Sequence, residues 1–195
     1  MFCTIQVESA LGFELVGADW TYRHHPIEIL FEICSHKLPQ GAVAIVQNAA
    51  SKWNSPSLRL RAVTKDCGPL NGLFPIRDGR NRIDFGPLEQ YAAPGRSELK
   101  WKNGRIAECD VRFNAALSWN VGEKAPTHIE WDLASVALHE MGHCIGLADV
   151  RDRTLNPRPV MLEVLSPGEE RRKLTKDDIS GRDAIYARRL TNGKS

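Results

Sequence analysis

Apolar side chains recur along the chain at two different spacings, and each spacing predicts a different kind of element. In residues 42–53 they recur every three to four positions, as on the buried face of an amphipathic helix. In residues 58–62 they alternate with arginines, a spacing typical of a half-buried strand. Residues 13–23 are rich in apolar and β-prone side chains and predict a first strand.

A later group of strands is predicted around a tight turn. Residues 81–85 predict a short strand that follows a segment rich in Gly and Pro. The dipeptide Asn103-Gly104 then separates two strand-like runs at about residues 98–102 and 105–113. Asn-Gly favours a two-residue hairpin turn, because both central residues of that turn need positive φ. The sequence therefore predicts an antiparallel pair of strands here.

Two helices are predicted in the last third of the chain. Asp132 is a good N-cap for a helix that runs through Val136 and His143 to Gly146. After a Pro-rich loop, Thr175 is a good N-cap for a closing helix that continues to residue 186. Strands come first and helices last, with one helix inserted early, and this order predicts an α+β domain.

Length and composition fit one globular domain. The 195 residues can bury one core but are too few for two ordinary domains, so we expect a single domain over residues 1–195. Within it, residues 1–12 are expected to be a disordered segment or a leader remnant, and residues 191–195 a tail. Apolar residues make up 42% of the chain and charged residues 26%, but no apolar run approaches the ~18 residues of a membrane span.

The charge distribution argues against a nucleic-acid partner. The net charge is only +2, whereas nucleic-acid-binding domains carry a larger and more clustered positive excess. The two short basic clusters, Arg171-Arg172-Lys173 and Arg188-Arg189, are interpreted as solvated helix faces.

The cysteines are odd in number, widely spaced and without a C-x-x-C pair, which argues against a cysteine metal cluster. One or two disulfides with a leftover thiol remain open, because a sequence does not give the pairing. For each cysteine, a small buried apolar residue is the favoured interpretation. The five are Cys3, Cys34, Cys67, Cys109 and Cys144.

Candidate chemistry is concentrated on the helix predicted after Asp132. His139 and His143 are four residues apart, about 40° of rotation on a helix, so both imidazoles project from one face and can bind one metal ion. Glu140 lies about 100° round from His139, within reach of a water molecule at the metal but unsuited to being a third ligand. This is the H-E-x-x-H arrangement of zinc peptidases, in which the glutamate is the general base.

A catalytic zinc site needs a third protein ligand. All six histidines lie at or before the motif, so either a carboxylate completes the site or an upstream histidine, such as His128, folds back. Asp149 is the leading candidate, with Asp152 as an alternative. On a continuous helix Asp149 would face away from the metal, but Gly146 can take the left-handed conformation that ends a helix and reverses the chain.

The sequence H-E-x-x-H-x-x-G-x-x-D at residues 139–149 resembles the metzincin clan of zinc peptidases and, within it, the matrixins. Most members have histidine where this chain has Asp149, but small bacterial metzincins of the snapalysin type also have aspartate. Residues 158–161 resemble the methionine turn, with Met161 as the apolar floor under the zinc. Residues 174–186 resemble the closing helix of matrixins, whose paired aspartates, here Asp177 and Asp178, tie that helix to the methionine turn and sometimes to the mature N-terminus.

The resemblance implies a fold and a way of binding substrate. The fold is a twisted five-stranded mixed sheet with one antiparallel edge strand, a long early helix, an active-site helix and a C-terminal helix. A peptide or protein substrate would add itself as a further strand beside that edge. The residues expected to contact it are Tyr91, Ala92, Ala93, Val160 and Leu162.

The resemblance also implies a zinc endopeptidase that acts outside the cell, and we expect a monomer. One catalytic zinc would be held by His139, His143 and Asp149, with Glu140 as general base. No second zinc is expected, because no histidine occurs between residues 36 and 128, and the sequence does not indicate a calcium site. Two alternatives are a catalytically silent binding domain of the same fold and a gluzincin, whose third ligand would be a downstream glutamate: Glu163, Glu169 or Glu170.

Overall fold

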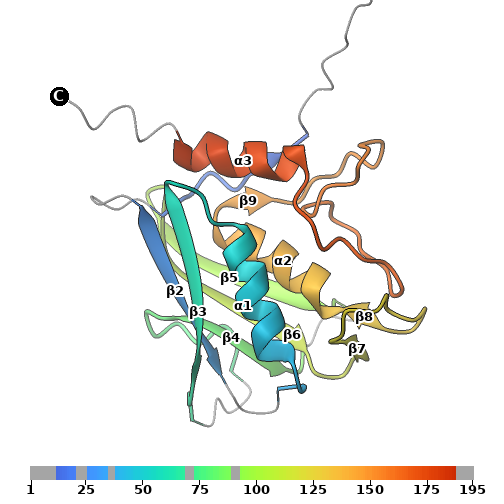
Figure 1. The fold of residues 1–195 in the computed structure, drawn as a ribbon. Helices are drawn as coiled ribbons and strands as arrows, with labels where there is room; N and C mark the ends of the chain where they lie inside the picture. Colours follow the sequence, from blue (N-terminus) through green and yellow to red (C-terminus); the bar gives the residue numbers. More distant parts are fainter. Residues whose placement is uncertain (1–11, 21–25, 35–37, 69–72, 89–92, 188–195) are drawn as a thin grey trace, which may run out of the picture.

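Four parallel strands and one antiparallel edge strand form the sheet at the centre of the molecule (Figure 1). The structure is a computed structural model and describes residues 12–20, 26–34, 38–68, 73–88 and 93–187. The strand order is β3-β2-β4-β6-β5, so the predicted five-stranded mixed sheet with one antiparallel edge is confirmed. The strands are β2 (Ile27–Cys34), β3 (Leu58–Lys65), β4 (Asn81–Gly86), β5 (Gly95–Lys102) and β6 (Arg105–Asn114).

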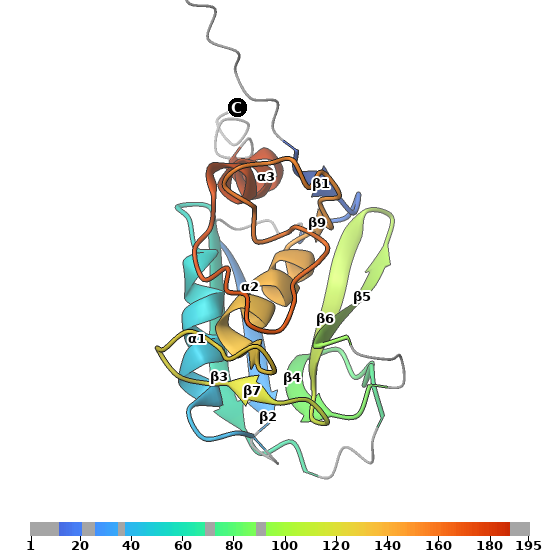
Figure 2. The same cartoon turned by 90° about the vertical axis from the view of Figure 1, so that its right-hand side faces the viewer.

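Two helices pack side by side on one face of this sheet, and a third lies across one end of the molecule (Figures 1 and 2). The first two are α1 (Ala42–Lys52) and α2 (Leu133–Cys144), and the third is α3 (Lys176–Tyr186). Short strand pairs flank α2: β1 (Glu14–Leu15) pairs with β9 (Leu147–Ala148), and β7 (Trp119–Asn120) pairs with β8 (Trp131–Asp132). The helix carrying the H-E-x-x-H motif is therefore enclosed by the sheet, α1 and the loop that precedes α3.

The predicted opening strand is only partly present among the described residues. Of residues 13–23, only Glu14 and Leu15 form a strand, while residues 21–23 lie outside the described residues. The long strand that pairs with both β3 and β4 is β2, residues Ile27–Cys34. Its sequence alternates buried and less buried positions, so the signal for a half-buried strand was present there.

The predicted hairpin is confirmed. Asn103 and Gly104 have φ values of 52° and 71°, and they join β5 to β6 as the Asn-Gly pair requires. β5 has a neighbour on one side only, which makes it the expected edge strand. The strands β3 and β4 are also found where the pattern predicts them, although β3 continues to Lys65.

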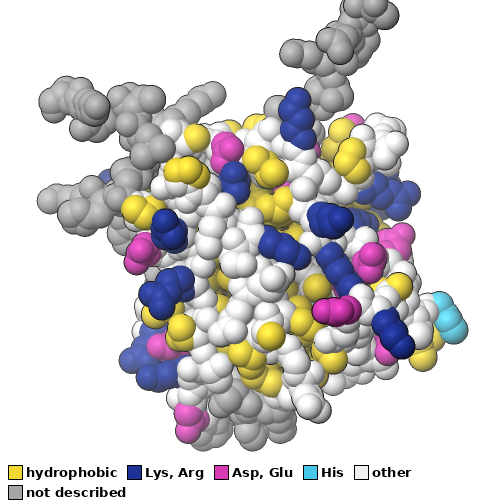
Figure 3. Space-filling view, in the orientation of Figure 1, with side chains coloured by type: hydrophobic (Ala, Val, Ile, Leu, Met, Phe, Trp, Pro, Cys, Tyr) yellow, Lys and Arg dark blue, Asp and Glu magenta, His cyan; other side chains and the backbone are white. Residues whose placement is uncertain are grey.

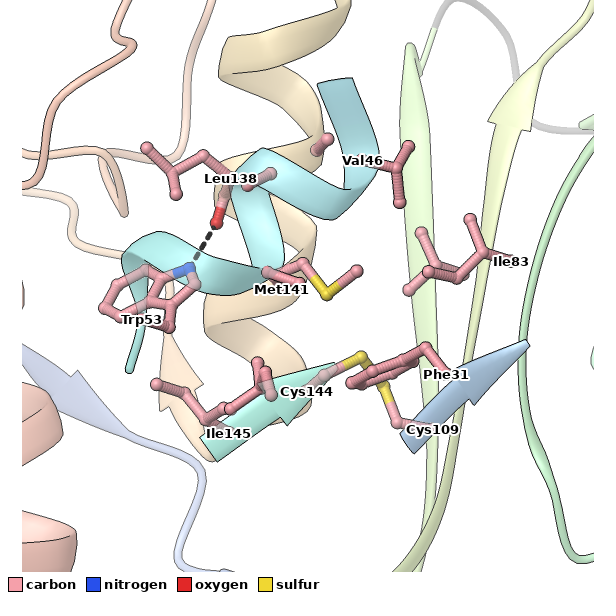
Figure 4. Packing of buried hydrophobic residues seen from close by; sticks show 14 of the residues in the cluster. Phe31, Val46, Trp53, Ile83, Cys109, Leu138, Met141, Cys144 and Ile145 are labelled. Atoms are coloured by element: carbon pink, nitrogen blue, oxygen red, sulfur yellow. Dashed lines mark hydrogen bonds between the residues drawn. A yellow bond between two sulfur atoms is a disulfide. The ribbon is translucent and has the colours of Figure 1, made fainter. Parts of the chain in front are cut away.

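The hydrophobic core lies between the sheet and the two packed helices (Figure 4). Trp53, which ends α1, is fully buried and donates from Nε1 to the Leu138 carbonyl of α2 at 2.9 Å. Phe31 and Ile83 face these helices from the central strands. The hydrogen bond from Trp53 to Leu138 fixes α1 against α2, because a buried indole N–H needs a partner.

The structure corrects the interpretation of the cysteines as isolated apolar residues. Cys109 of β6 and Cys144 at the end of α2 form a disulfide inside the core (Figure 4). Cys34 and Cys67 form a second disulfide. Cys3 lies outside the described residues. The pairing could not be read from the sequence, because the partners are 33 and 35 residues apart and meet only through the sheet and helix packing.

The basic cluster at residues 171–173 also differs from its interpretation as a solvated helix face. It precedes α3, and the Arg172 side chain pairs with the buried Asp132 carboxylate at 2.6 Å. The Arg171 side chain is only 10% exposed. Arg188 and Arg189 lie outside the described residues. On the face drawn in Figure 3, positive and negative side chains are interspersed. Among the described residues, no helix is long and apolar enough to cross a bilayer.

Candidate metal centre

The helix α2 begins where the sequence predicts. Asp132 is its N-cap, and the Asp132 carboxylate accepts a hydrogen bond from the Ser135 amide at 2.9 Å. The Asp132 charge is itself paired with Arg172. From this fixed start, His139 and His143 follow one turn apart on the side of the helix that faces a pocket.

The chain reverses directly after α2. Gly146 has a φ of 101°, in the left-handed region, and its amide donates to the His143 carbonyl at 2.8 Å. The next two residues form β9, and Asp149 follows. A Cβ at Gly146 would lie 2.5 Å from the Ala18 carbonyl oxygen, so the position has no space for a side chain. The reversal predicted from this glycine is confirmed, and it brings Asp149 beside the two histidines.

Three potential ligand atoms meet at one point. The His139 and His143 Nε2 atoms are 3.1 Å apart, and Asp149 Oδ1 lies 3.2 Å from the first and 3.4 Å from the second. Zinc bonds of 2.0–2.1 Å in tetrahedral geometry would hold their ligand atoms about 3.3 Å apart. The three side chains therefore have the spacing of a zinc site before any ion is considered.

The hydrogen bonds of the His139 and His143 imidazole rings also fit a metal site. His139 Nδ1 donates to the Val160 carbonyl and His143 Nδ1 to the Leu147 carbonyl, both at 2.9 Å. A carbonyl only accepts, so the proton of each neutral ring is on Nδ1, and each Nε2 presents a lone pair to the centre. With both rings neutral in this way, the buried Asp149 Oδ1 receives no hydrogen bond from either Nε2. Three electron-pair donors facing one another fit a cation.

Without a metal, the same cluster attracts protons. Burial favours the neutral form of His143, but the hydrogen bond with Asp149 and the charges of Glu140 and Asp149 outweigh burial and raise the pKa of His143 to about 9. For Asp149, burial acts to raise the pKa, but the hydrogen bonds to His139 and His143 prevail and lower it. A protonated imidazole and a carboxylate thus stabilise each other, and a metal ion would have to displace that proton.

Glu140 lies at the inner side of the same pocket. Its side chain projects toward the start of β5, where a Cβ at Gly95 would lie 2.9 Å from Glu140 Oε1. Glu140 is 6% exposed, and no residue within the described ranges donates a hydrogen bond to its carboxylate. The absence of a side chain at Gly95 is therefore what leaves room for the carboxylate between helix and edge strand.

Two neighbouring aspartates at the start of α3 tie other segments to that helix, and one of these segments carries Met161. Asp178, near the start of α3, accepts from the Val160 amide at 3.0 Å and from the Met161 amide at 3.1 Å. Asp177 accepts from the amides of Gly12 and Phe13 at 2.6 and 3.1 Å. The paired aspartates therefore join the closing helix to the methionine turn and to the first described residues, as expected.

A pocket of about 500 Å³ opens beside the three candidate ligands. Ala93, Val160 and Leu162, which were expected to contact substrate, line it. Tyr91 and Ala92 lie outside the described residues. His128 is exposed and does not belong to the candidate metal group. The predicted residues on both sides of the cleft are thus brought to one pocket wherever the structure describes them.

Several lining residues were not predicted: Gly95, Trp131, Ser135, Val136 and Arg171. For Ser135 and Val136 a signal was available, because they lie four and three residues before His139, respectively, and so on the same helix face. Nothing in the local sequence distinguished Arg171. Its place depends on the course of the loop between Met161 and α3.

Comparison with known proteins gives a consistent picture. A family model described as Matrixin matches residues 21–187. Matrix metalloproteinase-2 of Drosophila melanogaster is 27% identical over 178 residues, a match that covers 89% of this chain and 22% of the fly protein. Matrix metalloproteinase-16 of Rattus norvegicus is 24% identical over 194 residues, covering 89% of this chain and 28% of the rat protein. The chain thus spans about a quarter of the length of these relatives.

Among solved structures, the chain is similar to High choriolytic enzyme 1, a hatching enzyme zinc-protease from Oryzias latipes. The two are 13% identical with a TM-score of 0.48, and the match covers 87% of this chain and 94% of the other.

Proposed function

This chain belongs to the matrixin family, and on that basis we propose that it is a zinc endopeptidase whose metal is held by His139, His143 and Asp149. The observation that carries the proposal is the meeting of three lone-pair-bearing atoms at 3.1, 3.2 and 3.4 Å from one another. Zinc at this place would act as a Lewis acid that polarises a water molecule and the scissile carbonyl. The aspartate in third position is the snapalysin-like feature of the site.

Glu140 is the proposed general base. Its carboxylate is largely removed from solvent, faces the pocket and has no donor among the described residues, so its lone pairs remain available. In the proposed reaction Glu140 takes a proton from water as the water oxygen bonds to the scissile carbonyl carbon. Glu140 then gives this proton to the departing amine nitrogen as the C–N bond breaks. The carboxylate ends the cycle unprotonated, as it began.

The substrate is proposed to bind as an extended peptide along β5. An edge strand offers unpaired amides and carbonyls to a further strand, and β5 is such an edge. Residues 93–97, where β5 begins, line the pocket opposite Val160 and Leu162. A peptide lying between these two segments would pass the three ligands and Glu140.

We also propose that the protein acts outside the cell. The two disulfides among the described residues are typical of proteins that fold and remain in an oxidising compartment. This agrees with the secreted location expected from the family resemblance.

Neither alternative is favoured by the site. A gluzincin would need a downstream glutamate beside the histidines, but Glu169 pairs with Arg158 and Arg171, and Glu170 pairs with Arg172. Glu163 lines the pocket, yet it is not part of the group of candidate ligands. A silent binding domain would have no need for a buried, unpaired Glu140.

The test is hydrolysis of casein or of a quenched peptide library, with and without a zinc chelator. We expect cleavage that stops with the chelator and returns when zinc is restored. Cleavage that persists after the metal has been removed, or no cleavage by zinc-loaded protein, would contradict the proposal.

A further inference from the structure

The pocket beside the candidate metal centre has two chemically different ends. At one end lie the three candidate ligands and Glu140. At the other end lie Ser135 and Arg171. The Ser135 hydroxyl oxygen accepts from the Arg171 amide at 2.6 Å, so Arg171 is fixed to the first turn of α2. Between the two ends the lining is largely apolar, from Val136, Leu162 and Leu165.

The Arg171 guanidinium is held in the pocket wall. Its NH1 donates to the Leu162 carbonyl at 3.0 Å, and its NH2 donates to the Val164 carbonyl. NH2 also contacts a Glu169 carboxylate oxygen at 3.5 Å. A guanidinium has five N–H groups, so these three contacts leave donor capacity for a ligand. Because two contacts are to backbone, the side chain is positioned before any substrate arrives.

The positive charge of Arg171 is only partly compensated. Asp132, the carboxylate at the same end of α2, is already paired with Arg172 at 2.6 Å. Glu169 is 40% exposed and is shared with Arg158. The Asp178 carboxylate also acts on Arg171, but it already accepts hydrogen bonds from three backbone amides. The Arg171 side chain, in contrast, is 10% exposed. A poorly solvated cation with a shared, exposed partner favours an anionic ligand over a neutral one.

The length of the pocket limits which anion can reach this charge. Ser135 lies one helical turn before His139, about 6 Å along the axis. The Arg171 amide is bonded to Ser135, so a substrate side chain that enters beside His139 has to extend about this far along Val136 to come alongside residue 171. A glutamate side chain is long enough to extend this far and ends in a carboxylate. An aspartate side chain also ends in a carboxylate but is one methylene shorter. The rim residue Glu163 is exposed, so solvent screens its charge.

We propose that Arg171 makes this pocket selective for an acidic side chain, glutamate above all, at a residue flanking the scissile bond. This inference rests on the proposed peptidase function. It assigns the protein a substrate class: extended peptides with a glutamate next to the cleaved bond. Lysine and arginine are disfavoured at that position of the substrate, since they would bring a second positive charge close to the partly desolvated Arg171 guanidinium.

The experiment compares quenched peptides that differ only at the residue on one or the other side of the scissile bond. Glu, Gln, Leu and Lys are tested at each position with the zinc-loaded protein. At one of the two positions we expect kcat/KM for Glu to exceed that for Gln by about 10- to 100-fold, the range of a hydrogen bond to a charged group. Equal rates for Glu and Gln at both positions would overturn the inference. Failure to cleave any peptide would instead contradict the proposed function.

Three variants identify the source of the preference. Arg171→Gln should bring the ratio of kcat/KM for the Glu peptide to kcat/KM for the Gln peptide close to one. Arg61→Gln is the matched control, because it removes an exposed positive charge that neither lines this pocket nor pairs with Glu169, and the ratio should be retained. Arg96→Gln removes the other arginine of the lining and should also retain the ratio. Loss of the ratio with Arg96→Gln but not with Arg171→Gln would overturn the assignment.

A fourth variant covers the case in which Arg171→Gln fails to fold. Glu169→Gln removes the carboxylate that competes for Arg171 and lies at a partly exposed position. It should raise the Glu to Gln ratio above that of the unmodified protein. An unchanged or lower ratio in Glu169→Gln would contradict the role given to Arg171.

Discussion

Met161 packs directly against Gly142, in the middle of the helix that carries both candidate histidine ligands. A Cβ at Gly142 would overlap Met161 Sδ and lie 2.9 Å from Trp53 Cζ2. The methionine turn therefore fits under α2 only because residue 142 has no side chain. The carbonyl of Val160, the neighbour of Met161, accepts a hydrogen bond from His139 Nδ1, so this packing also helps to orient the His139 ring.

Gly142→Ala should accordingly destabilise the protein. Overpacking a rigid core costs about 1–3 kcal/mol, which corresponds to a fall in Tm of several degrees. Thermal unfolding of the zinc-loaded protein checks this. The loss in the double variant Gly142→Ala/Met161→Ala should be smaller than the sum of the two single losses, because the overlapping sulfur is gone. If the two substitutions were simply additive, the contact would not be the cause.

Asp178→Asn should lower stability more than Asp177→Asn. The Asp178 carboxylate is 1% exposed and accepts from the amides of Val160, Met161 and Thr175. Each hydrogen bond to a charged group contributes about 1.5–3 kcal/mol. Asp177 accepts only from Gly12 and Phe13 among the described residues. Denaturant unfolding of both variants measures the difference, and equal losses would argue against the role of Asp178 in holding the methionine turn.

Features fixed by neighbouring residues were predictable from the sequence. The Asn103-Gly104 turn, the Asp132 and Thr175 caps and the reversal at Gly146 each depend on a few adjacent residues, and all four are present. The meeting of the two histidines with Asp149 follows from the helical repeat and from that reversal. These parts could therefore be read from residue types and spacing alone.

Features that depend on distant segments were not predictable in the same way. The disulfide partners are brought together by the sheet and by α2. Arg171 reaches the pocket because its loop folds back on the first turn of α2. The missed strand β2 is a different case, since its alternation of buried and exposed positions is visible in the sequence. Residues 13–23, just before it, are also rich in β-prone side chains and carry a competing strand signal.

Zinc affinity should rise with pH up to about pH 9. The pKa of His143 is raised to about 9 in the metal-free protein, and zinc binds only the unprotonated imidazole. Below that pH His143 has to lose a proton when zinc binds. The Kd for zinc should therefore fall by up to about tenfold for each unit by which the pH is raised. Competition with a zinc-binding dye between pH 6 and pH 8.5 measures this. A Kd that does not change over this range would contradict the proton-for-metal exchange.

Glu140→Ala should abolish peptide hydrolysis while zinc remains bound. The substitution removes the proposed base but none of the three candidate ligands, so kcat should fall by about 100-fold or more. Glu123→Ala, at an exposed carboxylate outside the pocket, is the matched control and should keep normal turnover. Turnover near normal in Glu140→Ala would rule out the proposed mechanism.

Metal analysis of the purified protein tests whether Asp149 completes a zinc site with His139 and His143. The unmodified protein should contain close to one zinc ion per chain, and Asp149→Ala should contain much less. Asp152→Ala, at the exposed aspartate that the sequence left as an alternative ligand, should keep full occupancy. Full zinc occupancy in Asp149→Ala, or its loss in Asp152→Ala, would contradict the account.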